Sequence, residues 1–563
     1  MNIFAPHVTD GYKLGHPSQY APGTDFVTAN FTPRDFHHAN VLREVDTGKM
    51  VFAGLQYAIK DKLIDKWNST FFWKPKARVL AKFARRIKGY LGTGQGVAAQ
   101  ELMSNLHDLG YLPIRIKALP EGSRVNPGIP VFTVTNTIAG YGPLVNFLET
   151  ILSNSVWPIC NAASLSEQYY LLAKKYGAAT GASPDFWLPF AIHNFSMRGM
   201  RGEEDAIMSA FGHSLFHKGT DTFAVIDFAE EYYNANSDNE LIGASVNATE
   251  HATVCQQIAV HGGGHDGEVG ALREFLNIYP TGVLSYVSDS RDYWDVVSNI
   301  VPALKDEILA RGPNADGQPG VLTLRPDSSP DTPYEIIMGY KVMDVTDLED
   351  DADDYDDGGY TAIRYNGKLY AVTKEYGHYY WDEGIQRLKL GRELGEAEAK
   401  GTLQCLWETF GGEEVVGSDG KKYKLLDSHI RIIYGEAISL AMAQKIYKGM
   451  MDAGWSVGNV LFGVGSWAFL ANSSRDSYGV ACKATNSVVN GVDVPLQKDP
   501  KGTSSFKKSA RGRLRVERDG TDFVLLDNQT AEQEEGGELL EVFANGYITN
   551  EQTFQEITAL LLK

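Results

Sequence analysis

Residues 244–254, ASVNATEHATV, begin as a strand-like run and end on the charged pair Glu250 and His251. A histidine beside a glutamate is most often a hydrogen-bonded structural pair, so the pair alone assigns no chemistry. Whether the pair is catalytic depends on which residues follow the other strand-like segments of the chain. We take His251 as the candidate reactive centre because several later runs end in the same manner.

Short apolar runs that deliver polar or glycine residues recur along the chain. They are 186–192 with Phe195 and Arg198, 215–225 with Asp221, 282–288 with Asp289, 321–324 with Arg325 and Asp327, 430–434 with Gly435 and Glu436, and 460–462 with Gly463, Gly465 and Ser466. Such runs between helical segments are typical of parallel strands buried on both faces. Polar residues at successive strand ends favour a β/α barrel, and an open doubly wound sheet is the alternative.

The two ends of the chain have a different pattern. Apolar spacing predicts helices over 54–67, 79–90, 144–152, 164–176 and 553–562. Runs punctuated by Pro and Gly predict a small antiparallel β unit over 112–137 and a hairpin over 539–549. The first third of the chain is therefore expected to be α+β.

The totals limit the possible partners. With 563 residues, 43% of them hydrophobic, the chain can bury one large core or two, and we expect two or three domains. A net charge of −19 argues against nucleic acid or an anionic membrane as the main partner. The four cysteines form no closely spaced pair, which favours free thiols in a reducing compartment. With no signal-like start and no run of about eighteen apolar residues, we expect a soluble cytoplasmic protein.

Three further segments invite a functional interpretation. The acidic run 344–357 does not fit a calcium-binding loop and predicts a solvated loop, followed by a hairpin at Asn366-Gly367. HGGGHDGE, residues 261–268, is too rich in glycine for a helical zinc pair. The late basic residues, among them Lys483, Lys498, Lys507 and Lys508, indicate either an anion site or a flexible basic loop.

An ordered set of motifs resembles the nicotinamide phosphoribosyltransferase family of type II phosphoribosyltransferases. The motifs are DGYKLGHPSQYAPGT, GLQYAIKDKL, LPIRIKALPEG, NFLETIL, HNFSMRG, HKGTDT, EHAT, SDS, LRPDS, FGVG with SSRD, CKAT, and QKDP with RGRL. They span residues 10–513 in order. The resemblance implies a homodimer that joins nicotinamide to phosphoribosyl pyrophosphate with Mg²⁺. It also implies a barrel at 181–483 with an acidic insertion at about 344–412, and an α+β domain from 1–180 and 484–563.

The resemblance also implies residue roles. His251 matches a histidine that is phosphorylated from ATP, with Glu250, Asp289 and Asp327 as the other catalytic residues. Nicotinamide would lie between Phe195 and the partner chain's residue that matches Tyr12, with Asp221, Arg325 and Asp10 also lining this site. Residues matched to ribose and phosphate are Arg198, Arg325, Asp327, Gly435, Glu436, Gly465, Ser466, Arg475 and Arg34, and those matched to pyrophosphate or ATP are Lys483, Lys498 and Lys507. The metal ligands stay unassigned.

Some residues depart from the family pattern. Glu436 stands where the family has Asp, and Ser466 and Trp467 replace glycines in the phosphate loop. Rival functions are a nicotinate phosphoribosyltransferase, a catalytically silent nucleotide-binding dimer, and a barrel isomerase or aldolase for sugar phosphates. Asp221 disfavours the first, since its charge would repel a carboxylate substrate.

Overall fold

The structure is a computed structural model that describes residues 3–327, 332–348, 351, 354–355, 359–377, 385–499 and 508–563. The chain forms two compact units, each with its own sheet. Unit 1 comprises Met1–Gln168, Ser196–Gly243 and Phe469–Lys563, and unit 2 comprises Tyr169–Phe195 and Ala244–Ala468.

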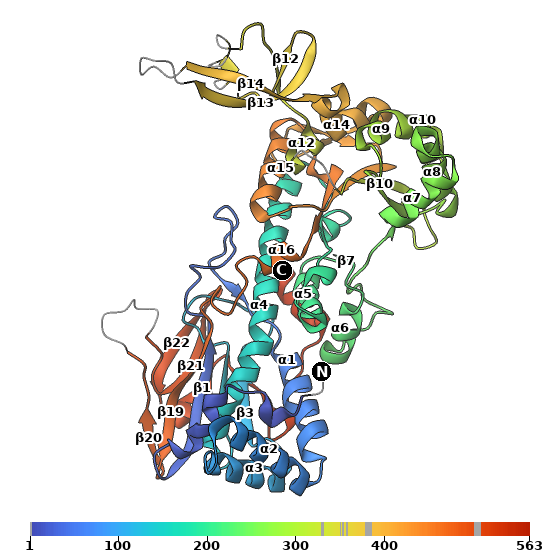
Figure 1. Cartoon of the computed structure of the whole chain (residues 1–563). Helices are drawn as coiled ribbons and strands as arrows, with labels where there is room; N and C mark the ends of the chain where they lie inside the picture. Colours follow the sequence, from blue (N-terminus) through green and yellow to red (C-terminus); the bar gives the residue numbers. More distant parts are fainter. Residues whose placement is uncertain are drawn as a thin grey trace. The chain divides into compact units, whose positions relative to one another are not determined.

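Unit 1 is built on a seven-stranded antiparallel sheet that interleaves the two ends of the chain (Figure 1). Asn30 of its strand β1 lies opposite Lys483 on one side and Thr133 on the other. This pairing of early and late segments confirms the expected α+β fold. The strands, in spatial order, are β20 (Val492–Pro495), β19 (Ala481–Val489), β1 (Thr24–Thr32), β5 (Phe132–Asn136), β3 (Ile114–Ala118), β23 (Leu540–Ala544) and β24 (Tyr547–Ile548).

Helices and two small sheets complete unit 1. The predicted helix over 54–67 begins as α1 but continues as two π-helical segments, Ala58–Asp65 and Asn68–Phe72. The paired strands are β2 (Met50–Val51) with β4 (Arg124–Val125), and β21 (Arg513–Asp519) with β22 (Asp522–Gln529). The helices are α1 (Leu55–Tyr57), α2 (Lys76–Leu91), α3 (Val97–Leu109), α5 (Glu203–Ser214), α6 (Val225–Tyr233), α17 (Ala531–Glu534) and α18 (Phe554–Leu562).

The segment Ser196–Gly243 packs with the chain termini rather than with the barrel residues that flank it in sequence. Phe228 of α6 lies 4.8 Å from Tyr57 of α1, and Phe211 of α5 lies 6.0 Å from Phe554 of α18, measured between ring centroids. Buried aromatic contacts of this kind decide which elements pack together. The contact-defined units therefore differ from the sequence-based boundaries at 169–180, 196–243 and 469–483.

A single helix, α4 (Gly142–Ala179), replaces the two that the sequence predicted over 144–152 and 164–176. Pro158 lies inside it, and a proline removes one backbone hydrogen bond. Its neighbours Val156, Ile159 and Cys160 are fully buried. Their packing outweighs the lost bond, because helices in proteins are stabilised mainly by tertiary burial.

Unit 2 contains a curled half-barrel of parallel strands. The spatial order is β8 (Asn247–Ala248), β9 (Val283–Val287), β10 (Val321–Arg325), β17 (Ile430–Tyr434), β18 (Val460–Val464) and β6 (Ile192–Asn194). The strands follow one another in chain order, and the first of them, β6, lies beside the last, β18. A doubly wound sheet reverses its order at a switch point, so the expected β/α barrel class is confirmed.

Helices lie between these strands in sequence, as the barrel pattern requires. They are α7 (His251–Val260), α8 (Gly264–Ile278), α9 (Tyr293–Asp295), α10 (Val301–Ala303), α11 (Lys305–Leu309), α12 (Pro333–Met338), α14 (Glu396–Phe410) and α15 (Leu440–Asp452), and α16 (Ser466–Leu470) follows the last strand. A hairpin of β15 (Gly412–Val416) and β16 (Lys422–Leu426) follows α14.

The insertion in unit 2 forms a separate four-stranded sheet. Its strands are β11 (Val342–Asp344), β12 (Ala362–Tyr365), β13 (Lys368–Gly377) and β14 (Ile385–Leu394). Asn366 and Gly367, with φ of 50° and 77°, turn the chain between β12 and β13, which confirms the predicted hairpin. Part of the acidic run, at 349–350, 352–353 and 356–358, lies outside the described residues.

Candidate functional site

The polar residues that follow β8, β9 and β10 come together in unit 2. Asp289 and Asp327 each come two residues after a strand, and His251 is the first residue of α7. The strands are parallel neighbours, with Arg325 of β10 opposite Val287 of β9. Carboxyl ends of parallel strands share one edge of a sheet, so the structure gathers these residues as their sequence positions indicated.

The centre of this group is a histidine held by a carboxylate. His251 Nε2 lies 3.0 Å from Asp289 Oδ1, and the Asp289 side chain is only 4% exposed. A carboxylate accepts a hydrogen bond, so this contact places the imidazole proton on Nε2. The lone pair is then on Nδ1, which lies 3.9 Å from Asp327 Oδ2. His251 itself is 43% exposed and open to a reactant.

The first turn of α7 adds a positive electrostatic end beside His251. Glu250 is the N-cap residue, and its backbone N–H donates to Thr253 Oγ1 at 3.3 Å. The Thr253 hydroxyl in turn donates to the Glu250 carbonyl at 2.9 Å. The remaining N–H groups of a helix start attract anions, so a phosphate near His251 would be stabilised there. The Glu250 side chain is exposed.

Arg325 at the end of β10 is anchored through a residue that sequence reasoning did not select. Its Nη2 donates to the Thr249 carbonyl at 2.5 Å, and the Thr249 hydroxyl accepts from the Val287 N–H at 2.8 Å. The buried Arg325 Nε has no hydrogen-bond partner among the described residues. A buried guanidinium N–H without a partner can donate a hydrogen bond to an anionic substrate.

Phe195 lies beside the glycines at the ends of β17 and β18. A β-carbon on Gly463 would lie 2.1 Å from Phe195 Cε2, and one on Gly435 would lie 3.2 Å from the same ring. The Phe195 N–H donates to the Val464 carbonyl at 3.0 Å, and the His193 ring lies 4.6 Å away. The close approach of the ring therefore requires glycine at both positions. Gly463, which the sequence placed at the end of a strand-like run, is brought against Phe195 by the fold.

The other predicted residues at these strand ends are accessible. Glu436 follows β17 and is exposed, and the next residue, Ala437, has a φ of 55° in the left-handed region. Gly465 comes directly after β18, and a β-carbon on it would meet no atom within 4 Å. Ser466 begins the short helix α16. Open backbone at Gly465 leaves room for a ligand to approach its N–H.

Unit 1 holds a separate basic group around a cavity of about 310 Å³. Burial lowers the pKa of Arg34, and the charge of Arg475 lowers it further. Burial also lowers the pKa of Lys483, with Lys498 among the charges near it. Lys508, one of the late basic residues noted in the sequence, lines the cavity, while Lys507 lies outside the described residues. Cations this close together favour an anionic ligand.

The remaining predicted residues also belong to unit 1. Tyr12 is 65% exposed and packs edge-on against His16, with ring centroids 5.0 Å apart. Asp10 accepts a 2.6 Å hydrogen bond from the Thr150 hydroxyl. Arg198 lies in the 3-10 turn Met197–Gly199, and Asp221 follows strand β7 (Gly219–Thr220); both side chains are exposed. Sequence reasoning suggested a solvated or site-completing arm for Tyr12, and its exposure fits either.

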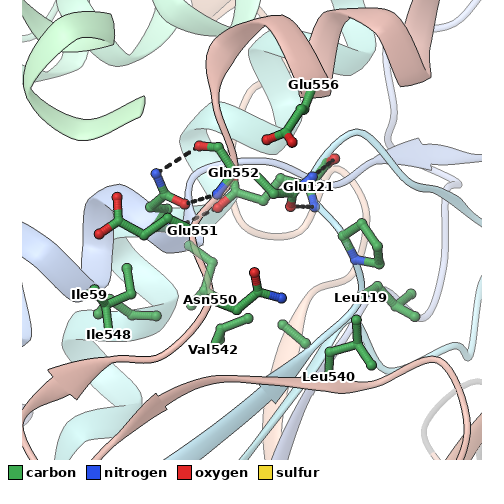
Figure 2. A pocket seen from close by; sticks show the side chains of 14 residues that line it. Ile59, Leu119, Glu121, Leu540, Val542, Ile548, Asn550, Glu551, Gln552 and Glu556 are labelled. Carbon is green, nitrogen blue, oxygen red and sulfur yellow. Dashed lines mark hydrogen bonds between the residues drawn. The ribbon is translucent and has the colours of Figure 1, made fainter. Parts of the chain in front are cut away.

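A second cavity in unit 1, of about 260 Å³, contains none of the predicted site residues. Figure 2 shows Glu121 and Gln552 along one wall, facing apolar side chains that include Leu540 and Ile548. The buried Glu121 carboxylate accepts from the backbone N–H groups of Gly54 and Gln56, each at 2.6 Å. These bonds are internal to the protein, which indicates a structural role.

The described residues also bear on metals and membranes. No group of three or more His, Cys, Asp or Glu side chains in the described part of the chain could hold a metal ion. Among the same residues, no helix has the length and apolar content needed to cross a bilayer.

The chain is similar in sequence to one protein family and to several known proteins. Residues 190–546 match the Nicotinate phosphoribosyltransferase (NAPRTase) family. A nicotinamide phosphoribosyltransferase of Acinetobacter baylyi is 39% identical over 549 residues, 97% of this chain and 95% of that protein. One of Xanthomonas campestris pv. campestris is 26% identical over 560 residues, 98% and 96% of the two chains. A crystal structure of nicotinate-nucleotide pyrophosphorylase from Pyrococcus furiosus aligns over 99% of this chain and 94% of that one, with 14% identity and a TM-score of 0.48.

Proposed function

Because the chain belongs to the nicotinate phosphoribosyltransferase family, we propose that it makes nicotinamide mononucleotide from nicotinamide and phosphoribosyl pyrophosphate, with ATP hydrolysis coupled through His251. The observation that carries this proposal is the pairing of His251 with buried Asp289 at the strand ends. Two relatives named nicotinamide phosphoribosyltransferase, aligned over nearly the whole chain, support the amide as substrate.

Synthesis of the mononucleotide needs a bound aromatic ring and a bound sugar phosphate. The nicotinamide ring nitrogen attacks C1 of the ribose while the bond from C1 to the pyrophosphate oxygen breaks, and pyrophosphate leaves with the electron pair. Charge placement and orientation supply most of the acceleration in such a step. Arg325 would hold substrate oxygens with its unpaired Nε, and Asp327 would bind ribose hydroxyls.

Phe195 provides the face on which the nicotinamide ring would stack, because Gly435 and Gly463 fix its position. The second face would come from Tyr12 of a partner chain in a homodimer, which suits the exposure of this tyrosine. Asp10 would line the same site. Asp221 would accept from the carboxamide NH₂ and repel the carboxylate of nicotinate, so it sets the preference for the amide.

Phosphate groups would be held by backbone and by cations. The ribose phosphate would bind at the ends of β17 and β18, to Gly435, Glu436, Gly465 and Ser466. The basic cavity of unit 1 would hold pyrophosphate or ATP phosphates. Lys483 and Lys498 are its proposed ligands, with Lys508 added by the cavity lining. Arg34, Arg475 and Arg198 are proposed for the ribose phosphate. The resemblance assigns Lys507 to pyrophosphate or ATP as well.

The ATP step uses the free nitrogen of His251. Nδ1 attacks the terminal phosphorus of ATP, the bond to the bridging oxygen breaks, and ADP leaves. Water then removes the phosphoryl group as inorganic phosphate. Asp289 keeps the proton on Nε2 during the attack and stabilises the positive ring that results. The N-terminal end of α7 stabilises the added phosphate.

Magnesium fits this chemistry as an ion that arrives on the substrate phosphates. The absence of a protein cluster among the described residues suits such an ion, since Mg²⁺ in phosphate sites is often held by few protein ligands. When bound it would neutralise part of the charge on the departing pyrophosphate. No residue is assigned to it.

The experiment that tests this function supplies the purified protein with nicotinamide, phosphoribosyl pyrophosphate and Mg²⁺, with and without ATP. We expect nicotinamide mononucleotide in both cases and more of it with ATP, with ADP released. His251→Ala is expected to abolish ATP hydrolysis and leave some synthesis. ATP hydrolysis that survives in this variant would remove His251 from the role.

A further inference from the structure

The loop that carries Asp289 is tied down through Arg291. Two residues after Asp289, Arg291 Nε donates to Glu268 Oε2 at 2.9 Å, and Arg291 Nη2 contacts Asp295. The guanidinium therefore bridges two carboxylates from different elements, α8 and α9. Its planar fork is suited to such a bridge, which a lysine ammonium reproduces only in part because it keeps the charge but not the bidentate geometry.

Glu268 is an unusual anchor because its side chain is fully buried. Burial raises the pKa of this carboxyl group, and the nearby Arg291 charge counteracts the rise. A buried carboxylate without a partner is costly, so Glu268 and Arg291 strongly restrict each other's position. Tyr286 of β9 faces the same carboxylate, and its pKa is raised by burial and then by Glu268.

The rest of the loop is fixed on both sides of Asp289. The Ser288 N–H donates to the Arg325 carbonyl at 3.0 Å. The Asp292 side chain caps α9 by accepting from the N–H groups of Trp294 and Asp295 at 3.1 and 3.2 Å. His265 Nδ1 lies 2.8 Å from Asp295 Oδ2, which adds a second tie to α8. His265 and Glu268 both come from HGGGHDGE, the motif left without a zinc role.

From this geometry we propose that Glu268 and Arg291 are positioning residues that hold the Asp289 carboxylate on His251 Nε2. They touch no substrate, and they act by fixing the loop between β9 and α9. A displacement of that loop by about 1 Å would lengthen the 3.0 Å hydrogen bond between His251 Nε2 and Asp289 Oδ1. The imidazole proton would then no longer be held on Nε2. The inference rests on the proposed phosphorylation of His251.

The test compares Arg291→Met with Arg273→Met. Arg273 lies on α8, as Glu268 does, and its Nε donates to Glu307 Oε1 at 3.0 Å. Both partners are exposed, and among the described residues neither is hydrogen-bonded or ion-paired to the Asp289 loop. We expect Arg291→Met to lower the rate of acid-labile phosphate incorporation from ATP at least tenfold. The KM for nicotinamide and the synthesis without ATP should stay within twofold of wild type, and Arg273→Met should change none of these values.

Conservative variants separate positioning from loss of folding. Arg291→Lys and Glu268→Gln should each recover part of the labelling that Arg291→Met and Glu268→Leu lose. If Arg291→Met loses no more labelling than Arg273→Met, or loses synthesis without ATP to the same degree as labelling, the inference is overturned.

A second readout does not depend on ATP. Nitrogen-15 spectra of labelled histidine report which ring nitrogen of His251 carries the proton, with His251→Gln identifying the signal. We expect Nε2–H in the wild type and in Arg273→Met, and a mixture of tautomers in Arg291→Met. If the wild type fails to incorporate phosphate, the proposed ATP step fails, while this spectrum still decides the positioning role. An unchanged tautomer in Arg291→Met contradicts that role.

Discussion

The ring of Phe195 lies directly against the backbone of Gly463, so a β-carbon on that glycine would come within 2.1 Å of Phe195 Cε2 and 2.9 Å of the Gly435 Cα. Atoms at these separations must move apart. Gly463 of β18 and Gly435, just after β17, thus lie beside Phe195, the residue that follows β6. We call these two glycines the backbone platform. In the proposed site they hold in place the Phe195 ring on which nicotinamide would stack.

Gly463→Ala is therefore expected to displace Phe195 and weaken nicotinamide binding. Overpacking of this kind costs about 1–3 kcal/mol, which corresponds to a rise of roughly 5-fold to 150-fold in the KM for nicotinamide if the strain is relieved at the expense of binding. Steady-state kinetics with nicotinamide as the varied substrate checks this. The matched control is Gly312→Ala, also in unit 2, where a β-carbon meets no atom within 4 Å. Equal effects from both variants would rule out the platform.

Asp289→Asn tests the tautomer of His251. The new amide can donate to Nε2, which would move the imidazole proton to Nδ1 and remove the nucleophilic lone pair. We expect labelling of His251 from ATP to fall about 100-fold, since a carboxylate that selects a histidine tautomer has effects of at least this size. The KM for nicotinamide should change less than twofold. Normal labelling in this variant would show that Asp289 does not set the tautomer.

Asp221→Asn tests the preference for amide over acid. Removal of the charge should raise kcat/KM for nicotinate about tenfold, or about 1.4 kcal/mol, because the repulsion of the substrate carboxylate is lost. Parallel assays with nicotinamide and nicotinate measure the ratio. Asp227→Asn, an exposed residue of α6, is the control and should leave the ratio unchanged. A wild-type ratio in Asp221→Asn would remove the residue from specificity.

Lys218 gives a stability prediction with a defined pH range. Burial lowers its folded-state pKa to about 8 from 10.5, and its ammonium lies 4.7 Å from the Phe554 ring centroid. Between these pH values the unfolded chain binds more protons, so this group makes the folded state more stable as pH rises. Lys218→Met should therefore raise the unfolding free energy at pH 7 by on the order of 2 kcal/mol.

The advantage of Lys218→Met over wild type should shrink between pH 8 and 10.5. Denaturant titrations at several pH values measure it, with the exposed Lys88→Met as control. An advantage that is independent of pH would mean that the charge of Lys218 is not the cause.

The grouping of His251, Asp289 and Asp327 could be predicted because each follows a run that has the length and apolar content of a buried parallel strand. The barrel class followed from the same runs. Local signals also sufficed at Asn366-Gly367, where the two residues with positive φ turn the hairpin.

Other features depend on tertiary packing that no local pattern records. The spacing predicted two helices over 144–152 and 164–176, yet burial of the residues around Pro158 keeps α4 continuous. The segment Ser196–Gly243 joins unit 1 through aromatic contacts with residues far away in sequence. The contact of Gly463 with Phe195 and the place of Lys508 in a cavity lining could not be predicted, because both exist only in the folded chain. A glycine directly inside a barrel strand was the one available signal for Gly463.

The measurement that tests the central claim most directly supplies equal concentrations of nicotinamide and nicotinate with phosphoribosyl pyrophosphate, Mg²⁺ and ATP, and separates the two mononucleotides by chromatography. The account predicts that nicotinamide mononucleotide is the main product and that its yield falls when ATP is left out. Nicotinate mononucleotide as the main product would contradict it.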